Sequence, residues 1–304
     1  MKSQKELGIE IIALDMDPAS SGMFMAHGRA VIPAPAHPSF IAETIALCRR
    51  LKAQCLIPII DEELLIFAAN RERFAAAGIK LIANSAQTVR LAKDKYLSYQ
   101  FCLRQGILAP RTFLPAQIKA IKNSDYPLII KPVAGRGSQD TVKLNSAREL
   151  DFFRRGRKDY IIQEFVYGDE YTIDIVASPD GHILQALPRQ RVMVKAGMSY
   201  NGRTVKDRRL ISYGKAVAKK FFITGPFNVQ CIVNKKGIYL LEVNPKFSAG
   251  LPLTVAAGVN IPLILVKFAF GMAVKKKELI FRDGLYMLRF WEEIFVPGFR
   301  RSAA

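Results

Sequence analysis

The sequence predicts an α/β domain built on a parallel sheet, followed by a larger α+β body. Over residues 1–84, short apolar runs alternate with helical patterns, which is typical of parallel strands covered by helices. From Ser85 onward a helical segment is followed by many short β-rich runs, which indicate antiparallel hairpins with helices beside them. The chain has 304 residues, of which 50% are hydrophobic, and this is enough for two cores.

The first domain is expected to contain alternating strands and helices. The strands are predicted at Ile9–Leu14, Cys55–Ile60 and Ile79–Ala83. The helices are predicted at Ser39–Lys52, with Ser39 as N-cap, and at Asp61–Ala77, which has acidic residues in its first turn. A dinucleotide-binding glycine pattern and a Walker A loop are both absent from the sequence, so we expect a scaffold or a substrate wall.

The start of the chain is unusual for such a domain. Gln4–Leu7 has the pattern of the end of a first helix, closed by Gly8, and no strand precedes it. We therefore hypothesise that the parallel sheet lacks its first strand. This would leave an exposed edge or a gap beside the strand predicted at Ile9–Leu14.

The second part is predicted to begin with one long helix, Ser85–Gln105. Strands are expected at Pro127–Lys131, Tyr160–Val166, Glu170–Ala177, Phe227–Val233 and Ile238–Asn244. Further helices are expected around Ala147–Arg155 and Leu210–Lys220. The apolar stretch Leu253–Val274 contains an asparagine, a proline and a lysine, so we predict a buried helix rather than a membrane span.

The charge is distributed unevenly along the chain. The formal net charge is +19, from 45 basic and 26 acidic residues, and residues 1–85 contribute nothing because nine basic and nine acidic residues cancel there. The basic clusters of the second part are short and lack interleaved aromatic residues, which favours solvated helix faces over a nucleic-acid groove. The charge thus indicates that the second part handles anions, and we do not expect nucleic acid as the partner.

The cysteines and the N-terminal sequence further limit the class of protein that this chain can be. The four cysteines and three histidines show no metal-ligand or CxxC spacing, so neither a zinc site nor a disulfide scaffold is indicated. The N-terminus is too polar for a signal peptide. We expect a soluble, cytoplasmic protein without a membrane partner.

A lysine and a glycine-rich loop form the first candidate site. Lys131 ends an apolar strand, and the loop that follows contains Gly135, Gly137 and Ser138. Glycines let backbone N–H groups approach phosphate oxygens, and an ammonium group neutralises their charge. This pattern predicts a phosphate clamp, with an ordinary structural turn as the alternative.

The last predicted hairpin carries the second candidate site. If Lys235–Gly237 form a three-residue loop, Gln230 pairs with Glu242, and Asn244 shares their face of the sheet. Three oxygen-donor side chains on one face suit Mg²⁺. A two-residue loop would shift the register by one residue and break this arrangement. The alternative is a solvated polar face.

Four motifs, taken together, resemble the ATP-grasp superfamily, and most closely ligases similar to the carbamoyl-phosphate synthase large chain. They are Asp94-Lys95-Tyr96, Ile130-Lys131-Pro132 with the glycine loop, Gln163–Val166 with Glu170-Tyr171, and Leu241–Phe247. The resemblance covers nearly the whole chain. It implies a pre-ATP-grasp domain at 1–84, an ATP-grasp domain at 85–298 with a hinge near 163–170, and a tail at 299–304.

The resemblance also implies which residues bind ATP and metal. Lys95 and Lys131 would bind the α- and β-phosphates, beneath the glycine loop. The hinge residues Glu164, Phe165 and Val166, next to Gln163, would offer backbone groups to adenine, and Glu170 would accept hydrogen bonds from the ribose. Gln230, Glu242 and Asn244 would hold Mg²⁺, or alternatively Mn²⁺.

The implied reaction is transfer of the γ-phosphoryl group of ATP to a carboxylate, which gives an acyl phosphate that an amine attacks. Arg189, Arg191 and Lys195 are candidates for gripping the acidic substrate or the phosphoryl group, with a solvated strand edge as the alternative. Lys246 is a further catalytic candidate. The sequence leaves the carboxylate and the amine open, and it leaves the oligomeric state open, although a dimer would fit.

The sequence departs from the family pattern at two positions. Lys246 stands where the family has arginine, so the bidentate fork is lost. Asp140 introduces a negative charge beside the glycine loop, where the family has glycine. Two alternative functions stay open. One is a carbamoyl- or carboxyphosphate-forming enzyme, which would use the same residues; the other is a non-catalytic basic protein that binds nucleotides or nucleic acid, which the net charge and these two departures suggest.

Overall fold

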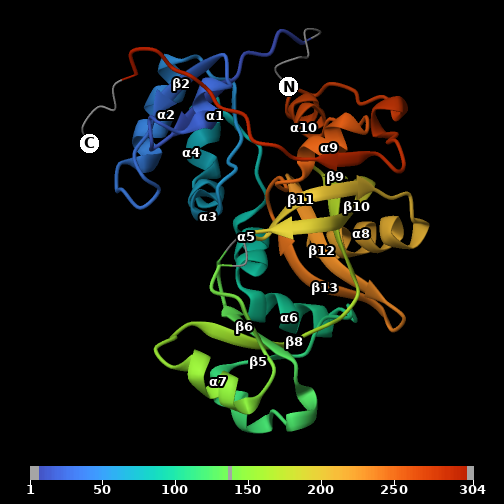
Figure 1. The fold of residues 1–304 in the computed structure, drawn as a ribbon. Helices are drawn as coiled ribbons and strands as arrows, with labels where there is room; N and C mark the ends of the chain where they lie inside the picture. The colour runs from blue at the N-terminus through green and yellow to red at the C-terminus, as the bar shows by residue number, and fades with distance from the viewer. Residues whose placement is uncertain (1–6, 136–138, 300–304) are drawn as a thin grey trace.

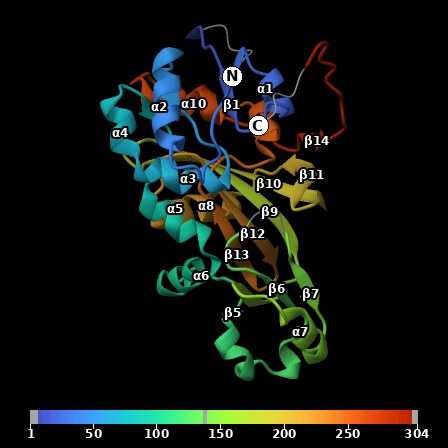
Figure 2. The same ribbon diagram turned by 90° about the vertical axis from the view of Figure 1, so that its left-hand side faces the viewer.

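A computed structural model describes residues 7–135 and 139–299 of the chain. Three parts follow one another along the long axis of the molecule (Figures 1 and 2): the N-terminal domain, a six-stranded sheet with its helices, and a four-stranded sheet at the far end. The predicted order, an α/β domain followed by an α+β body, is confirmed.

The N-terminal domain contains two separate pairs of parallel strands. β1 (Ile12–Asp15) pairs with β2 (Gly28–Val31), and β3 (Cys55–Leu56) pairs with β4 (Lys80–Leu81). The helices are α1 (Ser21–Phe24), α2 (Phe40–Arg50), α3 (Asp61–Ala69) and α4 (Arg71–Ala76). The prediction of one helix over Asp61–Ala77 was wrong, because the helix is interrupted at Asn70, and β2 was not predicted. Most of the helix end expected at Gln4–Leu7 lies outside the described residues, and the missing first strand stays a hypothesis.

The long helix predicted over Ser85–Gln105 is two helices, α5 (Ala86–Lys93) and α6 (Lys95–Arg104). Between them Asp94 has an extended backbone, with φ −92° and ψ 110°, and its Oδ1 accepts hydrogen bonds from the N–H groups of Tyr96 and Leu97, each at 2.9 Å. An aspartate in this conformation is a helix N-cap. The break therefore makes Lys95 the first residue of a new helix.

The four-stranded sheet is antiparallel and has its own core. Its strands, in spatial order, are β5 (Thr112–Phe113), β8 (Tyr160–Glu164), β6 (Leu128–Pro132) and β7 (Val142–Leu144). Helix α7 (Ala147–Arg154) and the 3-10 helices η2 (Pro115–Ala120) and η3 (Asn123–Asp125) complete this part. Leu128, Ile130 and Leu144 are fully buried on one face, while Lys131 lies on the other. The alternation of a strand thus turns Lys131 away from the core.

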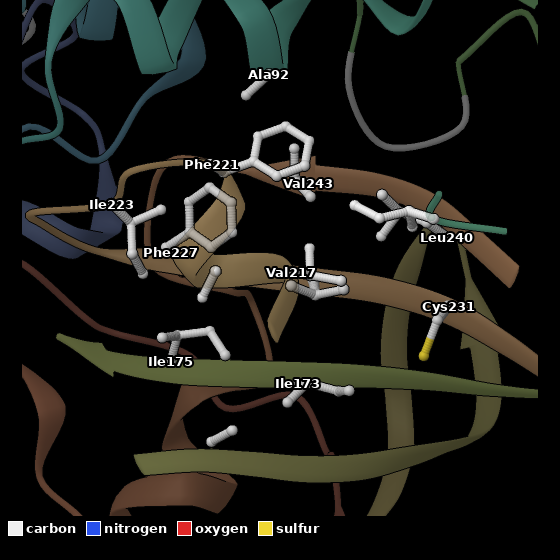
Figure 3. Packing of buried hydrophobic residues seen from close by; sticks show 14 of the residues in the cluster. Ala92, Ile173, Ile175, Val217, Phe221, Ile223, Phe227, Cys231, Leu240 and Val243 are labelled. Carbon is white, nitrogen blue, oxygen red and sulfur yellow. The ribbon is translucent and has the colours of Figure 1, made fainter. Parts of the chain in front are cut away.

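The six-stranded sheet is also antiparallel, in the order β13-β12-β9-β10-β11-β14. Its strands are β9 (Asp169–Ala177), β10 (Ile183–Lys195), β11 (Met198–Thr204), β12 (Phe227–Asn234), β13 (Gly237–Asn244) and β14 (Tyr286–Leu288). One face packs against α8 (Arg208–Lys220), and Figure 3 shows Ile173, Val217 and Phe221 in the resulting cluster. The opposite face is largely polar near β12 and β13, because alternate residues of a strand point to opposite sides.

In the hairpin β12–β13 the predicted loop length is wrong, but the predicted pairing of Gln230 with Glu242 is present. Asn234 pairs with Gly237, so the loop has two residues and not the three that we predicted. A β-bulge between Gln230 and Cys231 then shifts the register by one residue, and Gln230 faces Glu242 as expected. The bulge compensates for the shorter turn.

The apolar stretch after the hairpin also differs from the prediction of a single helix over 253–274. It forms α9 (Leu251–Ala256) and α10 (Ile261–Ala269), separated at Gly258, whose φ is +119°. After η4 (Lys276–Leu279) and β14, the chain returns across the molecule to the N-terminal domain (Figure 1), where the Phe299 ring lies 5.7 Å from that of Phe24. Among the described residues, no helix has the length and apolar character needed to cross a membrane.

Candidate active site

A cavity of about 380 Å³ lies between the two larger sheets, and α6 contributes to its wall. Ten of the residues singled out from the sequence line it: Lys95, Lys131, Gly135, Gln163, Glu164, Phe165, Val166, Glu170, Gln230 and Glu242. A more open hollow of about 510 Å³ shares Glu170 with this cavity and also includes Arg191. The fold thus collects, around one space, side chains that are far apart in the sequence.

Lys131 lines the cavity on the side of the four-stranded sheet and carries a positive charge there. Its Nζ donates a hydrogen bond to Gln163 Oε1 at 2.8 Å, and Gln163 Nε2 donates to Thr112 Oγ1 at 2.8 Å. Burial lowers the pKa of Lys131 to about 8; the nearby Glu242 carboxylate opposes this effect and the Lys95 ammonium adds to it. Lys131 is therefore a lysine that loses its charge at a lower pH than an exposed lysine does.

Lys95 lies beside it at the start of α6. Its Nζ donates a hydrogen bond to the carbonyl oxygen of Gly135, at 3.3 Å. Burial lowers the pKa of Lys95, while the carboxylates of Glu242 and Asp61 raise it. Two ammonium groups thus share one end of the cavity, and this end suits a polyanion.

The glycine loop is described only in part. Gly135 has φ +152°, a backbone conformation that favours glycine, whereas Gly137 and Ser138 lie outside the described residues. Asp140 is exposed and does not line the cavity; its carbonyl oxygen accepts a hydrogen bond from Arg157 Nη1 at 2.7 Å. The negative charge that departs from the family pattern therefore lies outside the cavity wall.

The hinge connects the two sheets along one side of the cavity. The Glu164 N–H donates to the Arg111 carbonyl at 2.8 Å, and the Phe165 N–H donates to the Pro127 carbonyl at 3.2 Å. These two donors are already used, so contacts with an adenine ring would fall to the other backbone groups of the hinge, including those of Val166. The Phe165 and Val166 side chains provide an apolar wall.

The opposite wall carries oxygen donors on β9, β12 and β13. Glu170, Gln230 and Glu242 line the cavity, whereas the predicted ligand Asn244 adjoins Glu242 without lining it. Gln230 Nε2 donates to Glu170 Oε1, and Asn244 Nδ2 donates both to Glu242 Oε1 and to Asn228 Oδ1, at 3.3 Å each. The amide nitrogens therefore turn toward neighbouring side chains, which leaves amide oxygens and the Glu242 carboxylate as the groups that could hold a metal ion. Hard oxygen donors of this kind fit Mg²⁺.

This donor set relies on amides. Among the described residues, no group of three histidine, cysteine, aspartate or glutamate side chains could hold a metal ion. Asn228, which was not predicted as a site residue, lies opposite Asn244 in the hairpin. It could have been found from its position, since it precedes Gln230 by two residues and thus shares its face.

Arg191 lies at the edge of the cavity and Lys195 further along the same strand. Arg191 Nε is 3.0 Å from Glu170 Oε1, and its Nη2 donates to the Gly197 carbonyl at 2.9 Å. Lys195 Nζ lies 4.3 Å from the centre of the Tyr200 ring. Arg191 thus contacts Glu170, which lines the cavity, while Lys195 lies at the end of β10 in the β10–β11 hairpin.

Arg189 is held in a different environment. Its side chain is 1% exposed, it forms a bidentate ion pair with Asp174 at 2.9 and 3.1 Å, and its Nη2 donates to Ser248 Oγ at 2.7 Å. A Cβ atom on Gly250 would lie 2.0 Å from Arg189 Nη1, so only glycine fits there. These contacts give Arg189 a structural role beneath the loop after β13, and they do not support the predicted role in gripping a substrate.

Lys246 joins the two domains beside the cavity. Its Nζ forms an ion pair with Asp61, the first residue of α3 in the N-terminal domain. Its carbonyl accepts a hydrogen bond from Asn228 Nδ2 at 3.0 Å, and the Pro245 carbonyl accepts one from Asn84 Nδ2 at 3.3 Å. Neither Asp61 nor Asn84 was predicted as part of the site, because contacts this far apart along the chain leave no local pattern in the sequence.

Comparisons with known proteins agree with this geometry. A family model described as "PylC-like, N-terminal domain" matches residues 1–82, and one described as "ATP-grasp in the biosynthetic pathway with Ter operon" matches residues 156–287. Carbamoyl phosphate synthase large chains are among the relatives. That of Thermoanaerobacter sp. is 25% identical over 228 residues, which are 69% of this chain and 21% of the relative. That of Pyrococcus furiosus is 28% identical over 207 residues, which are 61% and 19%.

Solved structures of biotin carboxylases share the fold. A Campylobacter jejuni biotin carboxylase has a TM-score of 0.74 at 19% identity, covering 91% of this chain and 69% of that one. The biotin carboxylase domain of Hydrogenobacter thermophilus 2-oxoglutarate carboxylase, in complex with MgADP and bicarbonate, has a TM-score of 0.73 at 18% identity, covering 93% and 69%.

The predicted resemblance to the ATP-grasp superfamily and to carbamoyl-phosphate synthase large chains is therefore confirmed. Residues 156–287 match an ATP-grasp family model, and residues 1–82 match the N-terminal domain of PylC-like proteins. The chain spans about a fifth of the length of those relatives. The domain boundaries at 84 and 298 and the roles of individual site residues stay predictions.

Proposed function

We propose that the protein is an ATP-dependent ligase that activates a carboxylate as an acyl phosphate and passes the acyl group to an amine. The observation that carries this proposal is the pairing, in one cavity, of two ammonium groups on one wall with a face of oxygen donors on the other. This arrangement suits a nucleoside triphosphate with its metal. The ATP-grasp fold and the relatives named carbamoyl phosphate synthase support it.

In this proposal the triphosphate lies along the lysine wall. Lys131 and Lys95 bind the α- and β-phosphates and become fully protonated as they do so, because a phosphate next to a buried ammonium raises its pKa. The hinge and Phe165 enclose the base. Glu170 accepts from the ribose hydroxyls, and the glycine loop covers the phosphates.

Glu242 and the amide oxygens of Gln230 and Asn244 would hold Mg²⁺, or alternatively Mn²⁺. The bound ion would neutralise phosphate charge at the reacting end. Lys246 and Arg191 would add positive charge around the γ-phosphoryl group. The protein side chains therefore act by positioning and by charge neutralisation, and no side chain has to form a covalent bond.

The proposed reaction has two steps. A carboxylate oxygen attacks the γ-phosphorus, and the bond to the bridging oxygen breaks, so that ADP leaves with the electron pair. A neutral amine then attacks the acyl carbon, loses a proton, and expels inorganic phosphate. The products are ADP, phosphate and an amide.

The test is to measure ADP and phosphate release with Mg-ATP and pools of carboxylic acids, with and without pooled amines. We expect turnover that needs an acid, and Glu242→Ala should lower kcat by at least about a hundredfold. Turnover unchanged in that variant would overturn the metal assignment. No turnover with any acid, together with salt-sensitive binding to nucleic acid, would overturn the ligase proposal.

A second candidate is formation of carboxyphosphate or carbamoyl phosphate. It is favoured by the names of the sequence relatives and by the bicarbonate bound in one structural neighbour. Bicarbonate, with and without ammonium, is therefore a separate arm of the assay. ATP turnover that responds to bicarbonate alone would select this candidate over an organic acid.

A further inference from the structure

The ion pair between Lys246 and Asp61 connects the N-terminal domain to the phosphate end of the cavity. The two side chains are 20% and 26% exposed, so they are neither in bulk water nor fully buried. Asp61 acts on more than Lys246, because its carboxylate also raises the pKa of Lys95. Asp61 therefore belongs electrostatically to the same end of the cavity as Lys95 and Glu242.

The backbone around Lys246 is fixed from several directions. Asn228 holds its carbonyl oxygen and Asn84 holds that of Pro245. Two residues further on, Ser248 is bound by the buried Arg189. The main chain of this loop is thus anchored, and the freedom that remains belongs to the long side chain of Lys246.

That freedom matters because lysine carries a compact charge on a flexible stem. Arginine, with its planar fork, is oriented by its own geometry when it binds a phosphate. A lysine in the same place needs another group to hold its direction. Asp61 is the carboxylate that holds the ammonium group here.

We propose that Asp61 is a positioning residue that directs the Lys246 ammonium toward the γ-phosphoryl group of ATP. This proposal rests on the proposed function, since it assigns Lys246 to phosphoryl transfer. Through Asp61 the N-terminal domain supplies the orientation that the lysine lacks. Asp61 itself does not line the cavity, so in this proposal it acts on the nucleotide only through Lys246.

The proposal predicts opposite effects on binding and on rate. In Asp61→Asn the ammonium is no longer shared with a carboxylate, so the γ-phosphate attracts it more strongly. At the same time the ammonium loses its fixed direction, which slows transfer. A residue needed only for folding would weaken binding and rate together.

The experiment compares Asp61→Asn with Glu72→Gln, which also removes a carboxylate from the first turn of an N-terminal-domain helix. Calorimetry gives Kd for ADP and for a non-hydrolysable ATP analogue. We expect the analogue to bind Asp61→Asn up to about fivefold more tightly, with ADP affinity unchanged. We expect kcat to fall by about tenfold or more. Glu72→Gln should match the wild type in its affinity for ADP, in its affinity for the analogue and in kcat.

The second part of the experiment repeats the Asp61→Asn comparison in a protein that carries the Lys246→Arg substitution. In a Lys246→Arg background, Asp61→Asn should change kcat by less than about twofold, because the fork orients itself. An equal loss in both backgrounds would overturn the proposal, as would weaker analogue binding in Asp61→Asn. The ratio of analogue to ADP affinity does not require turnover. If the wild type binds both nucleotides yet turns over no acid, the proposed function fails, while the ratio still tests whether Asp61 controls Lys246.

Discussion

At the scale of single residues, the cavity brings together two buried ammonium groups, and the nearby carboxylates neutralise their charge only in part. Lys131 and Lys95 both have lowered pKa values because burial disfavours their charged forms. Glu242 opposes this effect on each of them. A bound polyanion would offset the cost of burying these two charged lysines. Binding of the polyanion and protonation of the lysines are therefore linked.

The pKa of Lys131, about 8, gives a prediction for ATP affinity. Above pH 8 the free protein increasingly holds Lys131 neutral, so ATP must bring a proton with it. We expect Kd for Mg-ATP to rise up to about tenfold between pH 7 and pH 9, with proton uptake on binding at pH 9. Calorimetry in buffers of different ionisation enthalpy measures both.

Lys131→Arg is the control for this effect, because arginine stays protonated across that range. A steep pH dependence that survives in Lys131→Arg would assign the titration to another group. The folding stability of the ligand-free protein depends on pH in the opposite direction from ATP affinity. The unfolded lysine titrates near 10.4, so the unfolded state binds more protons between pH 8 and 10, and the contribution of Lys131 to stability rises with pH there.

Arg189 yields a prediction about stability. Replacing it with alanine would leave the buried Asp174 carboxylate without its cation, which costs about 3–5 kcal/mol of folding free energy. Chemical denaturation measures this loss. Arg209→Ala, which removes an exposed partner of Asp207, should leave the unfolding midpoint unchanged. A stable Arg189→Ala variant with lost activity would instead restore Arg189 as a catalytic candidate.

At the scale of elements, the sequence predicted five of the ten strands that the structure describes after residue 85, and it missed β5, β7, β10, β11, β14 and the breaks within helices. Helical periodicity continues through Asn70 and Asp94, and only the backbone angles at these residues interrupt it. The hairpin was more instructive. Its loop length was predicted wrongly, yet the Gln230–Glu242 pair formed because a bulge restored the register. Periodicity identifies faces, whereas bulges and caps depend on neighbours that a single sequence does not reveal.

The break at Asp94 can be tested through its role as a cap. Asp94→Ala should lower the free energy of unfolding by about 1 kcal/mol and weaken ATP binding, because α6 then presents Lys95 less firmly. Asp94→Asn should retain the stability, since asparagine caps equally well. It should retain most of the ATP affinity, because Lys95 keeps its place and loses only the smallest of the three carboxylate contributions that raise its pKa. Asp207→Ala removes the cap of α8, away from the cavity, and should reduce stability similarly without affecting ATP affinity. Equal loss of affinity in both alanine variants would contradict the role assigned to Asp94.

At the scale of the whole molecule, the N-terminal domain and the ATP-grasp body share an apolar cluster, in which Ile82 packs with Val176 and Ile264, and are also joined by specific polar contacts. Asp61 and Lys246 are separated by 185 residues, and Asn84 and Pro245 by 161. The chain also returns from β14 to place Phe299 against Phe24. The sequence could suggest the two domains, but it could not suggest these contacts, because no local pattern couples residues so far apart.

Asn84 is the most specific of these connections. It is fully buried, and its Oδ1 accepts hydrogen bonds from the N–H groups of Thr224 and Gly225, at 3.1 and 3.0 Å. Its Nδ2 donates to the carbonyls of Pro226 and Pro245, at 2.6 and 3.3 Å. One side chain thus satisfies four backbone groups of the ATP-grasp body, including the carbonyl that precedes Lys246.

Asn84→Ala should therefore act at two levels. The unpaired backbone groups should cost at least about 2 kcal/mol of folding free energy, measured by denaturant titration. The freed loop should also lower kcat, since Lys246 is no longer held, while ADP affinity stays within about twofold because Lys95 and Lys131 are unaffected. Asn145→Ala, at an exposed position, is the control and should change neither. A destabilised Asn84→Ala with unchanged kcat would show that Asn84 joins the domains without controlling the position of Lys246.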